Sequence, residues 1–277
     1  MNMRIKLAFK PRKVPLWTLL TLTLGLHGCI TDPFAKPRSP HLIDMQVLNP
    51  TNLPLEYTFS ETKPDPNREF ALEKSPNNVK QVVGYYDKLV RNRLMQDFKL
   101  ADVPYPSARL ALLGFKKERR LELWGGDTHG PMKRIKSYPF TAFSGELGPK
   151  RRQGDRQIPE GMYRITFLNP NSSYHLSMKL DYPNEFDRAM AEPERRHRLG
   201  GDIFIHGDNY SIGCIALGDR AIEELFVLTA WAGLDNVQVI VSPYDLRRDK
   251  EIRPLADIPW TRELYARIQD SLLAFHP

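Results

Sequence analysis

Cysteine is scarce in this sequence of 277 residues, which contains only Cys29 and Cys214. Zinc sites in proteins are built from several cysteine, histidine or carboxylate ligands. One histidine, His206, lies near Cys214 in the sequence. Two more, His175 and His197, are only loosely available. The ligand count therefore argues against a zinc site, and we expect no metal.

Long hydrophobic runs are also lacking. The apolar, uncharged stretch at residues 16–26 has about 11 residues, whereas a helix needs about 20 to span a bilayer core. A basic segment precedes it, with Arg4, Lys6, Lys10, Arg12 and Lys13. This arrangement is typical of an export signal.

The end of that signal, Leu26-His27-Gly28-Cys29, resembles a lipobox, in which the cysteine is acylated after cleavage. Ile30 follows, so nothing argues for retention at the inner membrane. We therefore expect residues 1–28 to be a lipoprotein signal peptide. The exported, periplasmic chain would be lipid-anchored to the outer membrane through Cys29, and an uncleaved amino-terminal anchor is the alternative.

If Cys29 carries lipid, Cys214 has no other cysteine in the chain with which to form a disulfide. Exported proteins lie where disulfides form, and a leftover cysteine there is a candidate reactive thiol. The alternative is a buried packing residue, because free cysteine behaves as a small hydrophobe.

Acidic residues are fewer than basic ones, 33 against 40, which gives a formal net charge of +7. Export makes nucleic acid a poor partner, so anionic envelope polymers or lipid head groups fit better. Once the signal is removed, roughly 250 residues remain, enough for one sizeable domain with an extension.

The first part of the mature chain reads as a tether followed by a helix. Residues 29–75 are rich in proline, asparagine and serine, which predicts a flexible tether. Ser75 suits an N-cap and Pro76 the first helical turn. Apolar residues then recur at helical spacing, at Val79, Val82, Val83, Tyr86, Leu89, Val90 and Leu94. We expect a helical extension over residues 76–107 that packs on the core.

From residue 108 onward, short strand-like runs alternate with turn residues. "RLALLGF" and "RRLELWGG" predict a hairpin, and the later runs are "RIKSYPFTAFS", "GMYRITFLN", "YHLSMKL", "DIFIHG" and "NVQVIVSPY". Asp219 is predicted to cap a helix that stops at Gly233, and Pro259 to open a last helix. The predicted fold is mainly β with flanking helices (α+β), with a catalytic domain at 108–245 and a C-terminal helical extension at 246–277.

The stretch "FIHGDNYSIGC" combines His206 and Cys214, eight positions apart across a tight turn. A neighbouring histidine can take the thiol proton and favour the thiolate, which is the nucleophile. Gly213 permits close approach of a substrate carbonyl, and the amides of Gly213 and Cys214 suit an oxyanion. These groups predict acyl transfer through a thioester, with Cys214 as nucleophile and His206 as general acid and base. The alternative is a structural histidine beside a packed thiol.

The pattern HG-x-x-x-S-x-G-C is similar to the signature of the YkuD-type L,D-transpeptidase catalytic domain. Two further segments, "SGELGPKRRQGDRQIPEGMY" and "NPNSSYHLSMKLDYPN", resemble its YafK-like branch. The resemblance covers roughly residues 108–245. It implies a β-rich fold, a cysteine nucleophile, peptidoglycan stem peptides as substrate and a role in cell wall biogenesis and cell shape. It also implies that no metal or diffusible cofactor is needed.

Two positions depart from the wider family. Ile212 stands where many members have a basic residue or histidine, and Ala216 where many have arginine. Ala216 has no group to hold a substrate carboxylate. The usual donor recognition is therefore not expected, although the thioester chemistry is.

Further residues are candidates for substrate binding. They are Ser211, Gly207, Lys150, Arg152, His175 and Tyr182. Lys150 to Arg156 form a basic cluster that suits stem-peptide carboxylates, or else a solvated loop. For His175 the alternative is a core histidine, and for Ser211 it is turn geometry.

Three functions stay open at this point. The leading one is a peptidoglycan L,D-transpeptidase-type acyl transferase. The second is a hydrolase of the same bond that releases crosslinks or peptidoglycan-attached lipoproteins. The third is a non-catalytic peptidoglycan-binding lipoprotein, against which the intact His206 and Cys214 pair argues.

Overall fold

The computed structural model describes residues 76–276, which belong to one compact unit. The predicted signal peptide, the tether and Cys29 lie outside the described residues. Within that range, no helix has the length and apolar character that crossing a bilayer requires.

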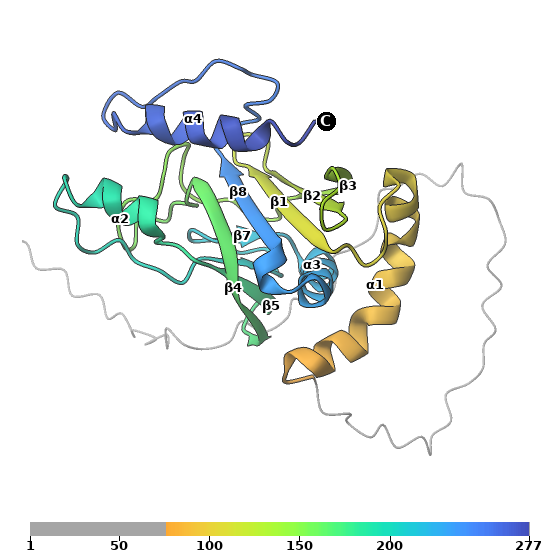
Figure 1. The fold of residues 1–277 in the computed structure, drawn as a ribbon. Helices are drawn as coiled ribbons and strands as arrows, with labels where there is room; N and C mark the ends of the chain where they lie inside the picture. The colour runs from red at the N-terminus through yellow and green to blue at the C-terminus, as the bar shows by residue number, and fades with distance from the viewer. Residues whose placement is uncertain (1–75, 277) are drawn as a thin grey trace, which may run out of the picture. The chain divides into compact units, whose positions relative to one another are not determined.

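The described residues form helices on both sides of a sheet (Figure 1). The helices are α1 (Val79–Ala101), α2 (Glu185–Ala191), α3 (Asp219–Ala232) and α4 (Thr261–Leu272), with a short 3-10 turn, η1 (Leu234–Asn236). The strands are β1 (Arg109–Phe115), β2 (Arg120–Gly126), β3 (Lys133–Pro139), β4 (Gly161–Ser172), β5 (His175–Leu180), β6 (Phe204–His206), β7 (Ile215–Ala216) and β8 (Val237–Ser242). The predicted fold class, mainly β with flanking helices, is confirmed.

The eight strands of the described range follow the order β3-β2-β1-β8-β4-β5-β6-β7. β1 pairs antiparallel with β2, which confirms the predicted hairpin. β1 with β8 and β6 with β7 are parallel pairs. The order places the predicted catalytic strand β6 near one edge, beside the two-residue strand β7.

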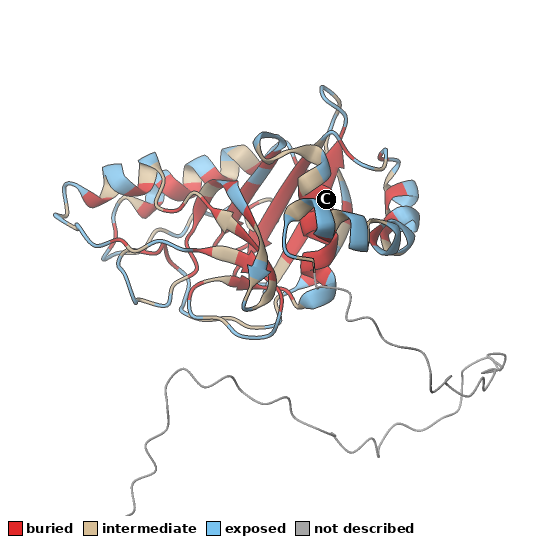
Figure 2. Cartoon of the chain, turned by 90° about the horizontal axis from the view of Figure 1, so that it is seen from below, coloured by how far each residue is buried: buried red, intermediate tan, exposed pale blue. Residues whose placement is uncertain are grey.

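Two apolar cores lie on opposite faces of this sheet. Leu112 of β1 and Val239 of β8 belong to the core shared with α1 and α3. Their neighbours Leu113 and Ile240 belong to the core shared with α4. Strands buried on both faces read as continuous apolar runs rather than alternating ones. Figure 2 shows these buried strands between helices whose outer faces are exposed.

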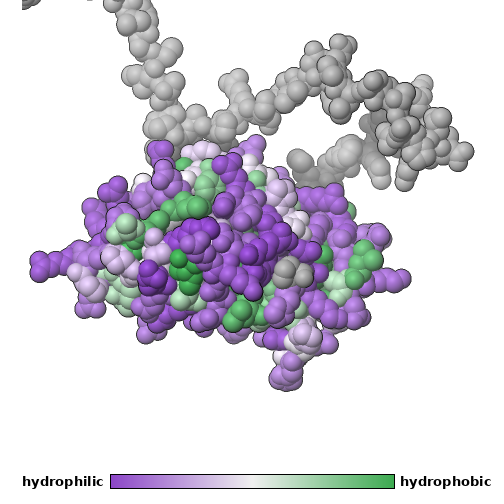
Figure 3. Space-filling model, turned by 90° about the horizontal axis from the view of Figure 1, so that it is seen from above, coloured by the Kyte–Doolittle hydropathy of each residue, from purple (hydrophilic) through white to green (hydrophobic). Residues whose placement is uncertain are grey.

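The helix α4 buries one side only. Leu264, Tyr265, Ile268 and Leu272 are buried, at the spacing that places them on one helical face. From above, the molecule is mainly hydrophilic with separate apolar spots (Figure 3). The predicted C-terminal helix is therefore a packed layer of the fold, although it begins at Thr261 rather than at Pro259.

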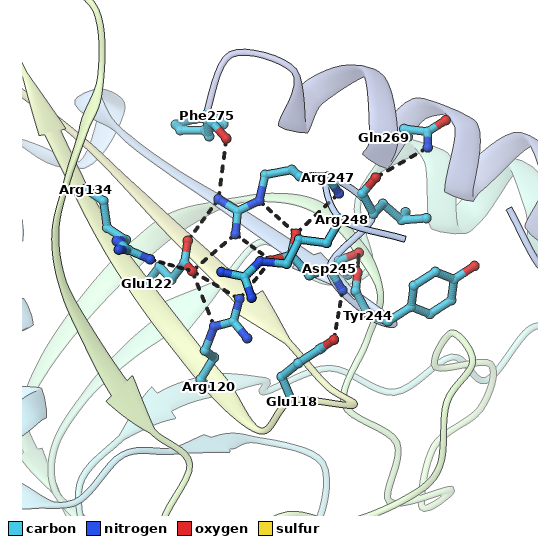
Figure 4. A network of polar contacts seen from close by, with 12 residues as sticks. Glu118, Arg120, Glu122, Arg134, Tyr244, Asp245, Arg247, Arg248, Gln269 and Phe275 are labelled. Carbon is cyan, nitrogen blue, oxygen red and sulfur yellow. Dashed lines mark hydrogen bonds and ion pairs between the residues drawn. The ribbon is translucent and has the colours of Figure 1, made fainter. Parts of the chain in front are cut away.

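A buried ion network fastens the C-terminal extension to the sheet (Figure 4). Arg247 pairs with Glu122 of β2 at 3.0 Å and with Asp245 at 2.8 Å. Arg120 of β2 also pairs with Asp245, at 2.8 Å. The Glu122 and Asp245 residues are almost fully buried, and buried charges persist only when they are paired. The network therefore links β2 to the chain that leads into α4.

The helix α1 begins later than the sequence predicts. Its N-cap is Asn78, whose side chain accepts the Gln81 N–H, and its first residue is Val79. Pro76 therefore precedes the helix, and Ser75 lies outside the described residues. By contrast, α3 begins one residue earlier than predicted, because Gly218 is its N-cap and Asp219 its first residue, and it ends before Gly233 as predicted.

The helix α2 is absent from the sequence prediction. A capping box starts it, because Asn184 accepts the Asp187 N–H and Asp187 accepts the Asn184 N–H. Asp187 also accepts the Tyr163 hydroxyl at 3.3 Å, and burial raises its pKa to about 6. This helix and the loop after it lie between β5 and β6, directly before the predicted catalytic histidine.

Candidate active site

His206 ends β6, and Cys214 stands directly before β7, the strand that pairs with β6. The parallel register places His206 opposite Ala216. Cys214 directly precedes β7, and so it lies close to the end of β6. Both residues line one cavity.

His206 is buried, with only 2% of its surface exposed. Its Nδ1 lies 2.6 Å from the Gly207 carbonyl oxygen, which can only accept a hydrogen bond. In the neutral ring, Nδ1 therefore carries the proton and Nε2 is left as an acceptor. Burial lowers the pKa of His206, although the Gly207 contact and the charge of Asp208 act in the opposite direction. His206 is thus a neutral base at rest.

Tyr174 covers the imidazole of His206. The ring centroids are 4.7 Å apart, and Tyr210 stacks on the outer side of Tyr174 at 6.3 Å. A Cβ at Gly207 would lie only 2.8 Å from the Tyr174 carbonyl oxygen. Gly207 therefore allows the turn to approach and supplies the carbonyl that orients His206.

Cys214 is a free, partly exposed thiol. Its Sγ donates to the Asp202 carbonyl oxygen at 3.8 Å, and among the described residues no hydrogen bond joins it to His206. Burial raises the pKa of the thiol, although the Phe204 N–H and the charge of Lys150 oppose this. Burial therefore favours a neutral thiol and a neutral imidazole in this pair.

The turn before Cys214 is tied by Ser211. Its hydroxyl donates to the Cys214 carbonyl at 2.8 Å and accepts the Gly213 N–H at 3.3 Å. Gly213 has φ +122°, and a Cβ there would lie 3.1 Å from the Gln157 carbonyl, so this position favours glycine. Ser211 thus serves turn geometry, the alternative raised by the sequence. The oxyanion role of Gly213 stays a prediction, since its N–H now faces Ser211.

The segment before β4, which contacts Gly213, is itself held by buried polar groups. Glu160 accepts the Gly148 N–H at 2.7 Å and pairs with Lys116 at 2.9 Å. Tyr265 of α4 donates to the other Glu160 oxygen at 2.9 Å. Lys116 is fully buried, so its charge needs this partner. The helix α4 thus helps to fix the segment that packs against Gly213, next to Cys214.

The cavity around Cys214 and His206 has a volume of about 470 Å³. Tyr210 and Ile212 line it and are 52% and 55% exposed, so its mouth has an apolar rim. Across residues 76–276, no three histidine, cysteine or acidic side chains gather as a metal site would require. The arrangement supports nucleophilic chemistry by a thiol beside a neutral base.

A comparison with protein families decides what kind of domain this is. Residues 113–241 match the family model of the L,D-transpeptidase catalytic domain, YkuD. This part of the chain belongs to that family. The resemblance predicted from the sequence motif is therefore confirmed for the L,D-transpeptidase domain.

Two curated relatives are the YafK proteins of Escherichia coli strains K12 and O157:H7. Each is 37% identical to this chain over 137 residues. The match covers 47% of this chain and 52% of each relative. The chain thus spans about half the length of the curated relatives it matches.

Solved structures give weaker matches to the L,D-transpeptidase domain. The helical cell shape determining protein Pgp2 of Campylobacter jejuni is 22% identical, with a TM-score of 0.41, 57% of this chain and 54% of that chain covered. Bd1075 of Bdellovibrio bacteriovorus is 20% identical, with a TM-score of 0.35, 59% of this chain and 56% of that chain covered. TM-scores this low establish neither a shared fold nor a shared function.

The basic cluster of the L,D-transpeptidase domain is largely paired within the protein. Lys150 lines the cavity, but its Nζ lies 2.5 Å from Asp155 and 3.0 Å from the Arg152 carbonyl oxygen. Arg151 pairs with Glu194 at 3.1 Å. Arg152 is exposed and does not line the cavity. The substrate role of Lys150 and Arg152 stays a prediction, and Lys150 is already paired with Asp155.

His175 and Tyr182 do not line the cavity around Cys214. His175 Nε2 lies 3.0 Å from Glu223 of α3 and 3.4 Å from the Tyr86 hydroxyl of α1. The Tyr182 hydroxyl donates to the Lys150 and Leu199 carbonyl oxygens, at 3.3 and 3.2 Å. The His175 ring is therefore paired with other groups of the fold, and Tyr182 links the loops that carry Lys150 and Leu199. The substrate roles of His175 and Tyr182 stay predictions.

Sequence reasoning missed Tyr174, Gln153 and the Gly200–Asp202 segment, all of which line the cavity. Tyr174 stands in the β4–β5 turn, directly before His175, so its neighbour was singled out instead. The two adjacent glycines before Asp202 indicate a loop just before β6.

Proposed function

We propose that this L,D-transpeptidase domain is a cysteine acyl transferase that acts on peptidoglycan stem peptides. The observation that carries the proposal is that Cys214 and His206 line one cavity, with His206 Nε2 left as a proton acceptor. Family membership supplies the reaction class.

The first half-reaction forms a thioester. His206 Nε2 takes the proton of the Cys214 thiol as Sγ attacks the carbonyl after the diamino acid at stem position three. When the tetrahedral intermediate collapses, the terminal D-alanine leaves as an amine and takes its proton from His206. Because both groups start neutral, the proton moves only as the new bond forms.

The second half-reaction releases the acyl group from Cys214. An amine acceptor attacks the thioester carbonyl, His206 accepts the amine proton and then returns a proton to the departing thiolate. Water in the acceptor's place gives hydrolysis instead, for example release of a peptidoglycan-attached lipoprotein. Transfer is our preferred outcome.

Hydrolysis remains the second candidate for a specific reason. Ile212 presents an apolar side chain at the cavity mouth, and Ala216 is completely buried. Neither residue offers a charged group to hold an acceptor beside Cys214.

One experiment separates the two outcomes. The purified chain is incubated with a tetrapeptide muropeptide and increasing amine acceptor in ¹⁸O-labelled water. Crosslinked product that grows with acceptor supports transfer. Label in the product carboxylate, with no amide at any acceptor concentration, supports hydrolysis, and Cys214→Ala is the inactive control for both.

The cellular setting of this activity is also a proposal. The basic and apolar amino-terminal segments and the lipobox-like residues before Cys29 support export and a lipid anchor at the outer membrane. A tethered domain there would meet peptidoglycan as its substrate. A non-catalytic, peptidoglycan-binding lipoprotein is the remaining alternative, and thioester formation on Cys214 excludes it.

A further inference from the structure

A second cavity, of about 620 Å³, adjoins the one around Cys214. Gln153 and Gly200 belong to the walls of both cavities. The Gln153 N–H donates to the Arg198 carbonyl at 2.8 Å, and a Cβ at Gly200 would lie 3.0 Å from Gln153 Cα. The shared wall is therefore closely packed backbone, and a bound chain at Cys214 has the second cavity as its neighbour.

The lining of this second cavity is mainly basic. Arg188 of α2, and Arg196, His197 and Arg198 of the loop after it, face a single acid, Glu192. Arg196 is already held by Glu194 and by the Arg151 carbonyl. The remaining arginines of this lining are Arg188 and Arg198.

Arg188 and Arg198 are exposed, and within residues 76–276 neither side chain makes an ion pair or hydrogen bond. By contrast, Lys150 and Arg151 of the cluster predicted from the sequence are paired with Asp155 and Glu194. Among the arginines that line the second cavity, the uncommitted positive charge thus lies on Arg188 and Arg198. A guanidinium group matches a carboxylate in geometry as well as charge.

We propose that this second cavity is a subsite for a free carboxylate of the peptide whose carbonyl reacts at Cys214. Arg188 and Arg198 bind that carboxylate, while Gln153 and Gly200 separate it from the thiol. The subsite rests on the proposed function for its substrate class, a stem peptide with free carboxylates. It also compensates for Ala216, which has no group to hold a carboxylate.

Binding tests the subsite independently of catalysis. In a Cys214→Ser background, titration calorimetry compares a synthetic tetrapeptide stem with its carboxamide counterpart. Arg188→Gln/Arg198→Gln should weaken binding of the carboxylate peptide by about tenfold or more, as loss of a charge-assisted hydrogen bond does. The carboxamide peptide should bind equally to both proteins.

The matched control removes two exposed arginines elsewhere, Arg164→Gln/Arg220→Gln, which lie outside the walls of both cavities. Arg198→Gln alone serves as a second variant, since it changes one exposed loop residue. The subsite would be overturned if the double variant weakened binding of the carboxylate peptide no more than the control does. It would also be overturned if binding of the carboxamide peptide were weakened equally.

The same peptides separate this inference from the proposed function. Protein with intact Cys214 is examined by mass spectrometry for an acyl adduct. If Cys214 forms an adduct but the carboxylate and carboxamide peptides bind equally well, the subsite is refuted and the proposed function is not. Discrimination in the Cys214→Ser protein, without an adduct on intact Cys214, refutes the proposed thioester and leaves the subsite standing.

Discussion

At the residue scale, burial determines the protonation of Cys214 and His206. It raises the pKa of the thiol and lowers the pKa of the imidazole, so it disfavours the charged form of each group. Had the imidazole been protonated beside a thiolate, the site would be reactive towards any electrophile. Because a thiol is a weaker nucleophile than a thiolate, burial instead slows the reaction of Cys214 with electrophiles in general.

Alkylation of Cys214 by iodoacetamide tests this protonation state. The reaction needs the thiolate, so its midpoint in the folded protein should lie above the ordinary thiol value of 9.0. Peptide mapping separates Cys214 from Cys29, and the unfolded chain gives the ordinary thiol as control. A folded-state midpoint below that of the unfolded chain would show a stabilised thiolate instead.

Tyr174 should control the acid limb of catalysis through His206. The Tyr174→Ala change removes the ring that lies 4.7 Å from the imidazole and lets water approach. Desolvation lowers the His206 pKa, so hydration raises it back towards its usual value, and the neutral base is then lost at a higher pH.

The acid limb of the acyl-transfer rate is therefore expected to move to higher pH in Tyr174→Ala, and to stay in place in Tyr174→Phe. His206→Ala should lower the rate about 100- to 10,000-fold across the profile. An unchanged profile in Tyr174→Ala would show that its ring does not set the environment of His206.

The sequence predicts some features of the candidate site and not others. The eight-residue spacing of His206 and Cys214 predicts a turn between them, and the structure places both in one cavity. The Gly207 carbonyl that orients His206 is a backbone group, which sequence does not reveal. Lys150 pairs with Asp155, five positions later, and the run of basic residues by itself does not indicate that pair.

At the element scale, the buried ion pairs of Arg247 should contribute more to the free energy of unfolding than the exposed pair of Arg248 with Asp245 does. Arg247→Ala leaves Glu122 and Asp245 buried with less compensation, which typically costs about 3–5 kcal/mol. Arg248→Ala is the matched control, since its side chain is 65% exposed and lies 3.7 Å from Asp245. Exposed pairs contribute about 0–1 kcal/mol.

Denaturant unfolding measures both variants. Similar free energies of unfolding for Arg247→Ala and Arg248→Ala would contradict a stabilising role for the buried network. A change confined to Arg247→Ala would support the view that the C-terminal extension is an integral layer of the fold.

Elements with regular patterns were predictable, and short ones were not. The apolar runs of β1 and β8 predict strands because both faces of these strands are buried. β7 has two residues and α2 has seven, too few to show a periodicity. Their existence depends on pairing with β6 and on the Asn184 capping box, which are tertiary and local contacts respectively.

At the scale of the whole molecule, the amino-terminal prediction concerns Cys29, outside the described residues. Radiolabelled fatty acid should enter the full-length protein in a bacterial host, and Cys29→Ser should prevent this and release the protein from membranes. Cys214→Ser is the matched control and should keep the lipid label. Unchanged membrane association and an unchanged lipid label in Cys29→Ser would favour the uncleaved anchor.

The central claim is that Cys214 carries an acyl group during the reaction. Intact-protein mass spectrometry after rapid quenching with a tetrapeptide donor tests it most directly. We expect an adduct equal to the donor without its terminal D-alanine, located on Cys214, removed by hydroxylamine and absent from Cys214→Ala. Product formation by Cys214→Ala at the wild-type rate would contradict it.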